Sequence, residues 1–451
     1  MIFAMNDPLA SLIDRHRGGE PVGITSVCSA NPLVLEATMR EARTAGAGGT
    51  AGAGGTAEAA QTAGGGRLVL VEATSNQVNQ AGGYTGMRPP DFRDLVHRAA
   101  RAAGLGEDRV LLGGDHLGPN PWRERPAEEA MVLAEEMVRG YAAAGFTKIH
   151  LDCSMACGGD PSPPGDALVS ERAARLARVA EEASHGRPIS YVIGTEVPVP
   201  GGAAEAIEGL EPTSAQAARA TLRAHRDAFS RAGLDDVWPR VRGLVVQPGV
   251  EFDEWSVVDY EPERTVQLQR VLGDEPGIAF EAHSTDYQTP EKLAALVRDH
   301  WAILKVGPGL TFALREALFA LEAIESELCP AEGRSRLRAV VEVRMLAHPE
   351  YWDRYYGGEE ATRRLARVYS LSDRLRYYWP DPEVDGAVQR LLANLGGVEI
   401  PLPLLANWLP LEYARVREGK LAAEPRALVL DHVSAVLRDY RRACEPDAVA
   451  G

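Results

Sequence analysis

Ionisable side chains follow several short apolar runs of this 451-residue chain. The run RVLLGG leads into Asp115 and His116, and KIHL leads into Asp152. Glu196 follows ISYVIGT in the same way, and His283 follows GIAFEA. A mixture of imidazole and carboxylate ligands favours Zn²⁺, Mn²⁺, Co²⁺ or Ni²⁺ over Mg²⁺, which prefers oxygen. We therefore predict a divalent metal held by His116, Asp152, Glu196 and His283, while an Asp–His acid/base arrangement without metal stays open.

The same apolar runs supply the residues that could move protons or stabilise negative charge. Carboxylates act as general acids and bases, and a buried amine stabilises a developing oxyanion. We predict that Asp115, Asp152, Glu196 and Lys305 are catalytic. No local metal motif such as HExxH is present, so the site depends on the fold bringing separate segments together.

Two glycine-rich turns, NQAGGYTGM at 79–87 and KVGPGLTF at 305–312, could hold a phosphate group on backbone N–H groups. The second turn follows the last strand-like run and directly precedes a helical pattern. Barrels of parallel strands often bind phosphate at this position. No GxxxxGK[ST] loop occurs, so no nucleotide is expected. The predicted substrate- and phosphate-binding residues are Glu72, Asn76, Gln247, Ser284, Thr285, Gly307 and Gly309.

Eight β-rich runs, each followed by a helical pattern, must position these residues. Near-continuous apolar strands that alternate with helices indicate a parallel sheet, and eight units indicate an α/β fold of the (β/α)8 TIM-barrel class. All strand ends of such a barrel open on one face, where polar residues would form a shared pocket. An open doubly wound sheet is disfavoured because no GxGxxG follows the first strand. The runs are 22–28, 67–74, 109–118, 148–155, 189–197, 241–249, 277–285 and 302–309.

The chain divides into a barrel at 1–328 and a C-terminal α-helical extension at 329–451 that packs on it. A Gly/Ala-rich segment at 44–66, with AGAGGT in tandem, is expected to be a flexible insertion on the N-terminal face. An aromatic cluster at 369–382 lies in the extension. We interpret it as a cap or subunit interface, with a lid over the pocket as the alternative. Its polar members are Ser370, Asp373, Arg374 and Arg376.

Composition limits the partners of the protein. A formal net charge of −16 disfavours nucleic acid and anionic membrane surfaces. Five scattered cysteines indicate no disulfide framework and favour a reducing cytoplasm, and Cys153 and Cys157 are expected to be packing residues. No stretch of about 18 apolar residues is present. We expect a cytoplasmic protein that forms a homo-oligomer.

Several longer segments carry a family resemblance. They include SVCSANPLVLEA, EATSNQVNQAGGYTGM, GGDHLGPNPW, AGFTKIHLDCSM, SYVIGTEVPVPGG, VVQPGVEFD, EAHSTDYQTP, ILKVGPGLTFALREALFALE and YSLSDRLRYYWP. Through them the chain resembles the non-catalytic (Z-type) subunit of class II D-tagatose-1,6-bisphosphate aldolase, from about residue 20 to 440. The segment 44–66 is longer than the connection usual in that family and lies outside every motif.

The resemblance implies two functions that share one carbon skeleton. The first is an accessory subunit that supports a separate class II aldolase catalytic subunit in tagatose or galactitol metabolism. The second is a metal-dependent hexulose-phosphate 4-epimerase that interconverts fructose 6-phosphate and tagatose 6-phosphate by retro-aldol and aldol steps. Both imply a ketohexose phosphate as ligand. Ionisable residues at almost every strand end favour some chemistry at the pocket.

Overall fold

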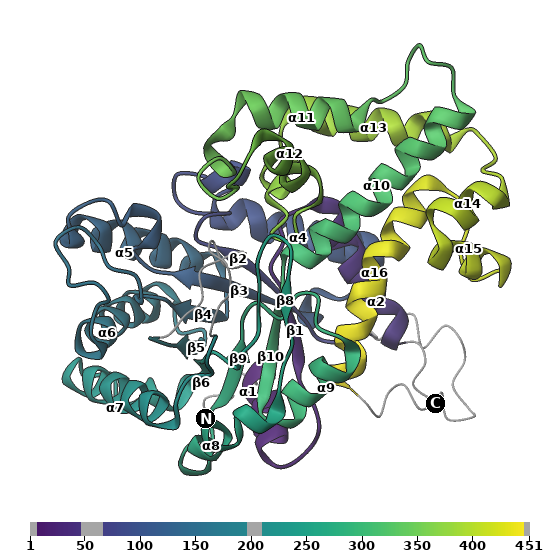
Figure 1. The fold of residues 1–451 in the computed structure, drawn as a ribbon. Helices are drawn as coiled ribbons and strands as arrows, with labels where there is room; N and C mark the ends of the chain where they lie inside the picture. Colours follow the sequence, from purple (N-terminus) through teal and green to yellow (C-terminus); the bar gives the residue numbers. More distant parts are fainter. Residues whose placement is uncertain (1–6, 47–65, 196–209, 446–451) are drawn as a thin grey trace, which may run out of the picture.

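A closed ring of eight parallel strands forms the centre of the protein. The computed structural model describes residues 7–46, 66–195 and 210–445. The strand order around the ring is β1-β10-β9-β6-β5-β4-β3-β2 (Figure 1), so the predicted (β/α)8 barrel is confirmed. Each predicted β-run overlaps one of these strands. Their bounds are β1 Ile24–Val27, β2 Val69–Thr74, β3 Val110–Leu117, β4 Lys148–Leu151, β5 Ser190–Ile193, β6 Val241–Val245, β9 Ala279–Ala282 and β10 Trp301–Val306.

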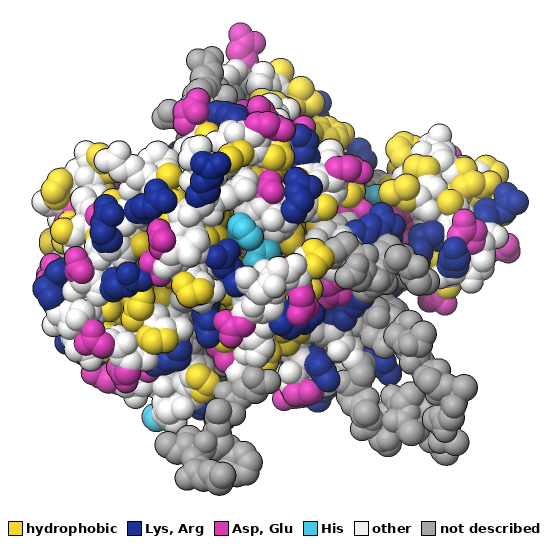
Figure 2. All heavy atoms as spheres, turned by 90° about the horizontal axis from the view of Figure 1, so that it is seen from below, with side chains coloured by type: hydrophobic (Ala, Val, Ile, Leu, Met, Phe, Trp, Pro, Cys, Tyr) yellow, Lys and Arg dark blue, Asp and Glu magenta, His cyan; other side chains and the backbone are white. Residues whose placement is uncertain are grey.

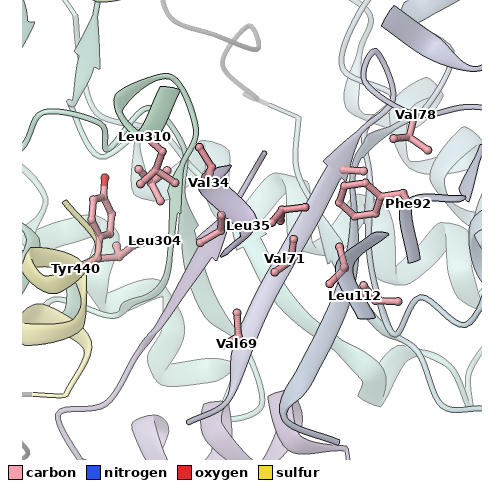
Figure 3. Packing of buried hydrophobic residues seen from close by; sticks show 14 of the residues in the cluster. Val34, Leu35, Val69, Val71, Val78, Phe92, Leu112, Leu304, Leu310 and Tyr440 are labelled. Carbon is pink, nitrogen blue, oxygen red and sulfur yellow. The ribbon is translucent and has the colours of Figure 1, made fainter. Parts of the chain in front are cut away.

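Successive residues of each strand point alternately into the barrel lumen and toward the outer core. In β2, Val69 and Val71 face the helices, whereas Leu70 belongs to a separate apolar cluster inside the barrel. Figure 3 shows Val69 and Val71 in the same apolar layer as Leu112 of β3 and Leu35 of the first barrel helix. This two-residue period means that Glu72, next on the inner side of β2, faces the lumen.

Helices surround the strands (Figure 1) and pack apolar side chains against them in the core. Each helix has an apolar side that packs against the strands and a polar side that points outward. Two of them end at glycines in the left-handed region, Gly104 with φ 70° and Gly145 with φ 97°, which release the chain toward the next strand. The barrel helices are α2 Pro32–Gly46, α4 Pro89–Ala103, α5 Ala127–Ala144, α6 Asp166–Ala183, α7 Ala215–Arg231, α8 Val266–Gln269, α9 Pro290–Arg298 and α10 Pro308–Leu328.

A short N-terminal helix, α1 Pro8–Arg17, covers the N-terminal end of the lumen. Its Leu9 and Ile13 pack against inward side chains of the strands, among them Leu111 and Ile303. Asp7, which caps this helix, also accepts a hydrogen bond of 2.6 Å from Ser190 Oγ of β5. The lumen is therefore apolar and closed at this end. Its polar contents lie further along, toward the C-terminal ends of the strands.

The C-terminal extension lies against one side of the barrel and over its mouth (Figure 1). Helix α16 packs against α10, α9 and α2, and Tyr440 on it donates a hydrogen bond to the carbonyl of Thr285 at the mouth. A small hairpin, β7 Glu251–Phe252 and β8 Val257–Val258, also stands at the mouth. The extension contains α11 Leu337–Ala347, α12 Glu360–Tyr369, α13 Pro382–Gly396, α14 Leu402–Trp408, α15 Pro410–Arg417 and α16 Pro425–Cys444.

The surface seen in Figure 2 intersperses acidic and basic side chains, with apolar side chains scattered among them. Within the described residues, no helix is long and apolar enough to span a bilayer. The predicted insertion at 44–66 falls largely outside the described residues: α2 continues to Gly46, and the description resumes at Gly66. Cys153 and Cys157 are buried, as expected of packing residues.

Candidate active site at the barrel mouth

A cavity of about 500 Å³ opens at the C-terminal ends of the strands. Its floor carries Asp115 and His116 from the end of β3, His283 from the end of β9, and Lys305 from β10. The wall includes Arg376 of the C-terminal extension. Further lining residues are Cys28, Ser29, Asn31, Asn76, Gln77, Tyr84, Phe252, Ser284, Asp286, Gly307, Tyr377 and Trp379.

Asp115 connects the residues of the floor. Its Oδ1 accepts hydrogen bonds of 2.9 Å from both the His116 N–H and His150 Nδ1, and its Oδ2 lies 2.6 Å from Lys305 Nζ. Burial opposes ionisation of this carboxyl, but the positive charges of His116 and Lys305 outweigh it and hold its pKa well below the usual range. Asp115 is therefore an anion fixed by three partners.

His116 is held from behind by Asp152, which follows β4. Its Nδ1 lies 2.7 Å from Asp152 Oδ2, and its Nε2 lies 3.5 Å from Asp115 Oδ2. The backbone of His116 is left-handed, with φ 49°, a conformation that costs energy for a residue other than glycine. Burial alone would lower the pKa of His116, but Asp115 and Asp152 together raise it. A strained, doubly supported imidazole on a cavity floor is typical of an acid/base group.

An ion-pair chain with alternating charges crosses the lumen below the floor. Lys305 contacts Glu72 at 2.6 Å, Glu72 contacts Lys148 at 2.5 Å, and Lys148 contacts Glu281 at 2.6 Å. Glu281 then lies 3.0 Å from His283 Nε2. Gly113 of β3 faces Glu72, and a Cβ there would come within 2.5 Å of its carboxylate, so only glycine leaves room for the chain.

This chain of ion pairs is completely enclosed. Glu72, Lys148 and Glu281 are all 0% exposed. Burial would lower the pKa of Lys148, but Glu281 and Glu72 raise it, and the pKa of Glu281 falls well below its ordinary value because Lys148 outweighs burial. Replacing buried ion pairs with apolar residues often costs a protein little stability, so a network of this size in a barrel lumen points to function.

Three histidine rings meet between the floor and the ion-pair chain. The ring centroids of His116, His150 and His283 lie 4.9 to 5.2 Å apart. Burial lowers the pKa of His283 to about 3, so its imidazole is neutral. The Nε2 atom of His150 is buried without a hydrogen-bond partner in the described part of the chain.

The donors around these rings fit a divalent metal. Asp115, His150, Glu281 and His283 offer four ligand atoms that all lie within 4.8 Å of one another. Two imidazoles and two carboxylates match the ligand preference of zinc and similar ions. A metal ion would also give the buried His150 Nε2 the partner that it lacks among the described residues. The same two carboxylates also contact Lys305 and Lys148, so a bound ion would share them.

The sequence matches the family of the D-tagatose-1,6-bisphosphate aldolase subunit, GatZ/KbaZ-like, over residues 9–48 and 55–445. The chain belongs to this family. It is also similar to the crystal structure of a probable tagatose 6-phosphate kinase from Sinorhizobium meliloti 1021, with 48% identity and a TM-score of 0.83. That match covers 94% of this chain and 100% of the other.

Two more distant solved structures also match this GatZ/KbaZ-like chain. One is the fructuronate-tagaturonate epimerase UxaE from Cohnella laeviribosi, with 13% identity and a TM-score of 0.45 over 93% of this chain and 82% of that one. The other is a fructose-bisphosphate aldolase from Campylobacter jejuni, with 13% identity and a TM-score of 0.40 over 86% and 91% of the two chains.

The GatZ/KbaZ-like structure brings together most of the residues predicted to be catalytic or metal-binding. Asp115, His116, His283 and Lys305 line one cavity, and Asp152 lies directly behind His116. The four-residue ligand group contains His283 but not His116 or Asp152, which pair with each other instead. Glu196 lies outside the described residues.

Of the residues predicted to bind substrate or phosphate, some line the cavity and others lie outside its lining. Asn76, Ser284 and Gly307 line the cavity, whereas Glu72 lies below it in the ion-pair chain. Gln247 Oε1 instead accepts hydrogen bonds from the backbone N–H groups of 249 and 250. Thr285 Oγ1 donates to the Lys305 carbonyl at 2.5 Å. Gln247 and Thr285 therefore hold loops of the mouth in place.

The glycine turn after β10 differs from the expected phosphate site. The N–H groups of Gly307 and Gly309 both donate to Asp286 Oδ1, at 2.9 and 2.7 Å. A buried carboxylate of the chain thus occupies the position predicted for phosphate. Asp286 follows β9, and the sequence gives no local sign of its contact with a turn more than twenty residues away.

The aromatic segment 369–382 contributes side chains to the pocket, as the alternative interpretation expects. Arg376, Tyr377 and Trp379 all line the cavity. Asp373 supports the segment from behind, where it accepts a hydrogen bond of 2.6 Å from Thr311 Oγ1 and lies 3.3 Å from Arg315 Nε. The backbone N–H of Arg374 donates to Tyr356, and Ser370 pairs with Ser372. Through this segment, the C-terminal extension forms part of the cavity wall.

Lys148 and His150 were not among the residues predicted from the sequence. They lie at the beginning and middle of β4, and the sequence reasoning considered only strand ends. The signal that could have found them is the period of two in KIHLD, where Lys148, His150 and Asp152 alternate with apolar residues. Glu281 and His283 show the same spacing in β9.

Proposed function

We propose that this protein binds a ketohexose phosphate in the mouth cavity and works with a separate class II aldolase catalytic subunit. Membership of the aldolase-subunit family across nearly the whole chain supports this role. The observation that carries it is the cavity of about 500 Å³ with Asp115, His116, His283 and Lys305 on its floor. A volume of this size suits a sugar phosphate, and convergent polar groups suit its hydroxyls.

A second function, 4-epimerisation of the ketohexose phosphate, is favoured by the ion-pair chain and the His116–Asp152 pair. A subunit that only stabilised a partner would not need buried acid/base groups. The C4 hydrogen of a 2-ketose is not adjacent to the carbonyl, so its direct removal is unassisted. Breaking and re-forming the C3–C4 bond inverts C4 without this step. The same bond is broken in aldolase chemistry, so both functions need one pocket.

The floor residues can be assigned roles in such a reaction. His116, oriented by Asp152, accepts the proton of the C4 hydroxyl and holds it until the bond re-forms. As that proton leaves, C4 becomes an aldehyde and the electron pair of the C3–C4 bond forms the C2–C3 enediolate. The Lys305 ammonium, fixed by Glu72 and Asp115, stabilises the negative charge on the C2 oxygen. Re-closure on the other aldehyde face returns the proton, so atoms and electrons balance.

A divalent metal would be held by His150, His283, Asp115 and Glu281. When bound, it would supply Lewis-acid polarisation of the ketose oxygens. Zinc, manganese, cobalt and nickel are the ions to test, since imidazole and carboxylate ligands suit each of them.

The experiment mixes the purified chain with fructose 6-phosphate and each metal, and follows tagatose 6-phosphate by ¹³C NMR. A parallel sample contains an aldolase catalytic subunit, whose rate is measured with and without the chain. Tagatose 6-phosphate that disappears on chelation and in His116→Ala supports the epimerase. Absence of turnover with stimulation of the aldolase supports the accessory role. Absence of turnover, stimulation and sugar-phosphate binding would refute both.

A further inference from the structure

The turn after β10 has no amides to spare for a substrate phosphate. Gly307 and Gly309 each donate their single N–H to Asp286 Oδ1. Asp286 is 3% exposed, and a Cβ on Gly309 would lie 3.1 Å from that oxygen, so the three groups are tightly packed. A phosphate at this turn would also meet the negative charge of the carboxylate. The donors for a phosphate must therefore lie elsewhere on the cavity wall.

The two strongly basic side chains that line the cavity differ in their partners. Lys305 lies 2.6 Å from both Glu72 and Asp115, so its charge is already balanced. Arg376 belongs to the C-terminal extension and lines the cavity wall. Within the described residues, no carboxylate oxygen lies within 4.0 Å of its guanidinium nitrogens. Arg376 is thus the cavity-lining cation without a direct ion pair.

The guanidinium of Arg376 is fixed in place by neutral groups. Its Nη1 donates to the carbonyls of Ser372 and Asp373, the latter at 3.0 Å, and its Nη2 donates to Tyr377 Oη at 3.2 Å. It also lies over the Tyr377 ring, 4.6 Å from the centroid. Tyr84, from the glycine-rich turn after β2, contacts that ring edge-on at 4.5 Å. The arginine is therefore preorganised between the extension and the barrel.

The arrangement leaves one edge of the guanidinium available. An arginine has five N–H groups, and the three hydrogen bonds above use both on Nη1 and one on Nη2. The Nε–H and the second N–H of Nη2 have no acceptor in the part of the chain that is described. The Nε–Nη2 edge of a guanidinium is one of the forks that can bind two oxygens of a phosphate or carboxylate.

We propose that the Nε–Nη2 edge of Arg376 is the phosphate subsite of this cavity. The inference rests on the proposed ketohexose phosphate ligand and assigns its phosphate to the C-terminal extension instead of the β10 turn. The sugar then lies between Arg376 and the floor formed by Asp115, His116 and His283. The extension completes the binding site, because the described residues of the barrel offer this phosphate no cation that lacks an ion pair.

The test measures binding by calorimetry for tagatose 6-phosphate, free tagatose and inorganic phosphate. We expect Arg376→Gln to weaken tagatose 6-phosphate about tenfold or more and to leave free tagatose unchanged. Arg376→Lys keeps the charge but lacks the fork, so it should bind with intermediate affinity. The matched control is Arg354→Gln. Arg354 also donates to the next tyrosine, at 2.9 Å, and lies 4.9 Å over its ring, but it is exposed and outside the cavity.

The outcomes separate this subsite from the proposed function. Equal affinity of Arg376→Gln and wild type for tagatose 6-phosphate overturns the subsite and leaves the function standing. An equal loss for tagatose and its phosphate also overturns it, since the residue would then only shape the wall. Binding of inorganic phosphate that depends on Arg376, without any sugar-phosphate binding, supports the subsite and overturns the function. If the wild type binds neither phosphate nor sugar phosphate, both fail.

Discussion

His116 Nδ1 and Asp152 Oδ2 lie 2.7 Å apart and join the ends of β3 and β4 at the floor of the cavity. The bond fixes the direction of the imidazole, and the charge of Asp152 favours its protonated form. Because Asp152 does not line the cavity itself, it acts through His116. It is therefore a positioning residue, and its effect should be measurable on the histidine.

Removing this charge should lower the pKa of His116. We expect Asp152→Asn to lower it, since a carboxylate in contact with an imidazolium favours the protonated form and raises its pKa. The measurement is an NMR titration of the imidazole in metal-free protein. Asp160→Asn is the control, because Asp160 pairs with Arg172 away from the floor. An unchanged His116 pKa in Asp152→Asn would contradict the assignment.

Lys148 should be the most sensitive position of the ion-pair chain. Lys148→Met leaves Glu281 without its buried lysine partner and Glu72 with Lys305 alone, and should cost roughly 3–5 kcal/mol of unfolding free energy in urea. Adding Glu281→Gln should recover part of the loss. Lys420→Met removes a lysine whose side chain is 63% exposed and should change little. Equal stability of Lys148→Met and wild type would show that the chain of charges is not needed.

The proposed metal ligands can be tested without any substrate. We expect equilibrium dialysis with Zn²⁺ or Co²⁺ to show binding to the wild type that His150→Ala and His283→Ala reduce at least about tenfold. The matched control is His225→Ala. Like His150, His225 is 0% exposed and its Nε2 lacks a partner among the described residues, but His225 belongs to α7. Equal losses in all three variants would mean that folding, not ligation, is affected.

The stability of the extension should depend on pH through His432 of α16. Its ring contacts Glu412 of α15 at 3.0 Å and Glu316 of α10 at 3.5 Å. Burial opposes protonation, but the two carboxylates raise the pKa of His432 from 6.5 to about 9. The protonated ring is favoured in the folded state, so its stabilisation is complete below pH 6.5 and is lost as the pH rises through 9. Tm should fall over that interval, and His432→Gln should flatten the fall; an identical slope in the variant would contradict this role.

The barrel was predictable from the sequence, and the details of its mouth were not. Strand runs and their polar ends are local signals, which is why the sequence alone singles out Asp115, His116, His283 and Lys305, all of which line the cavity. Contacts between distant segments have no such signal. Asp286 satisfies the amides of Gly307 and Gly309, and Arg376 reaches the cavity from the extension, only because of how the chain folds back on itself.

A crystal structure of the protein with tagatose 6-phosphate tests the central claim most directly. The account predicts sugar density in the mouth cavity, with the hydroxyls near Asp115, His116 and His283 and the phosphate on Arg376. Density that places the sugar outside this cavity, or its absence at saturating concentration, would contradict the claim that these floor residues form a ketohexose phosphate site.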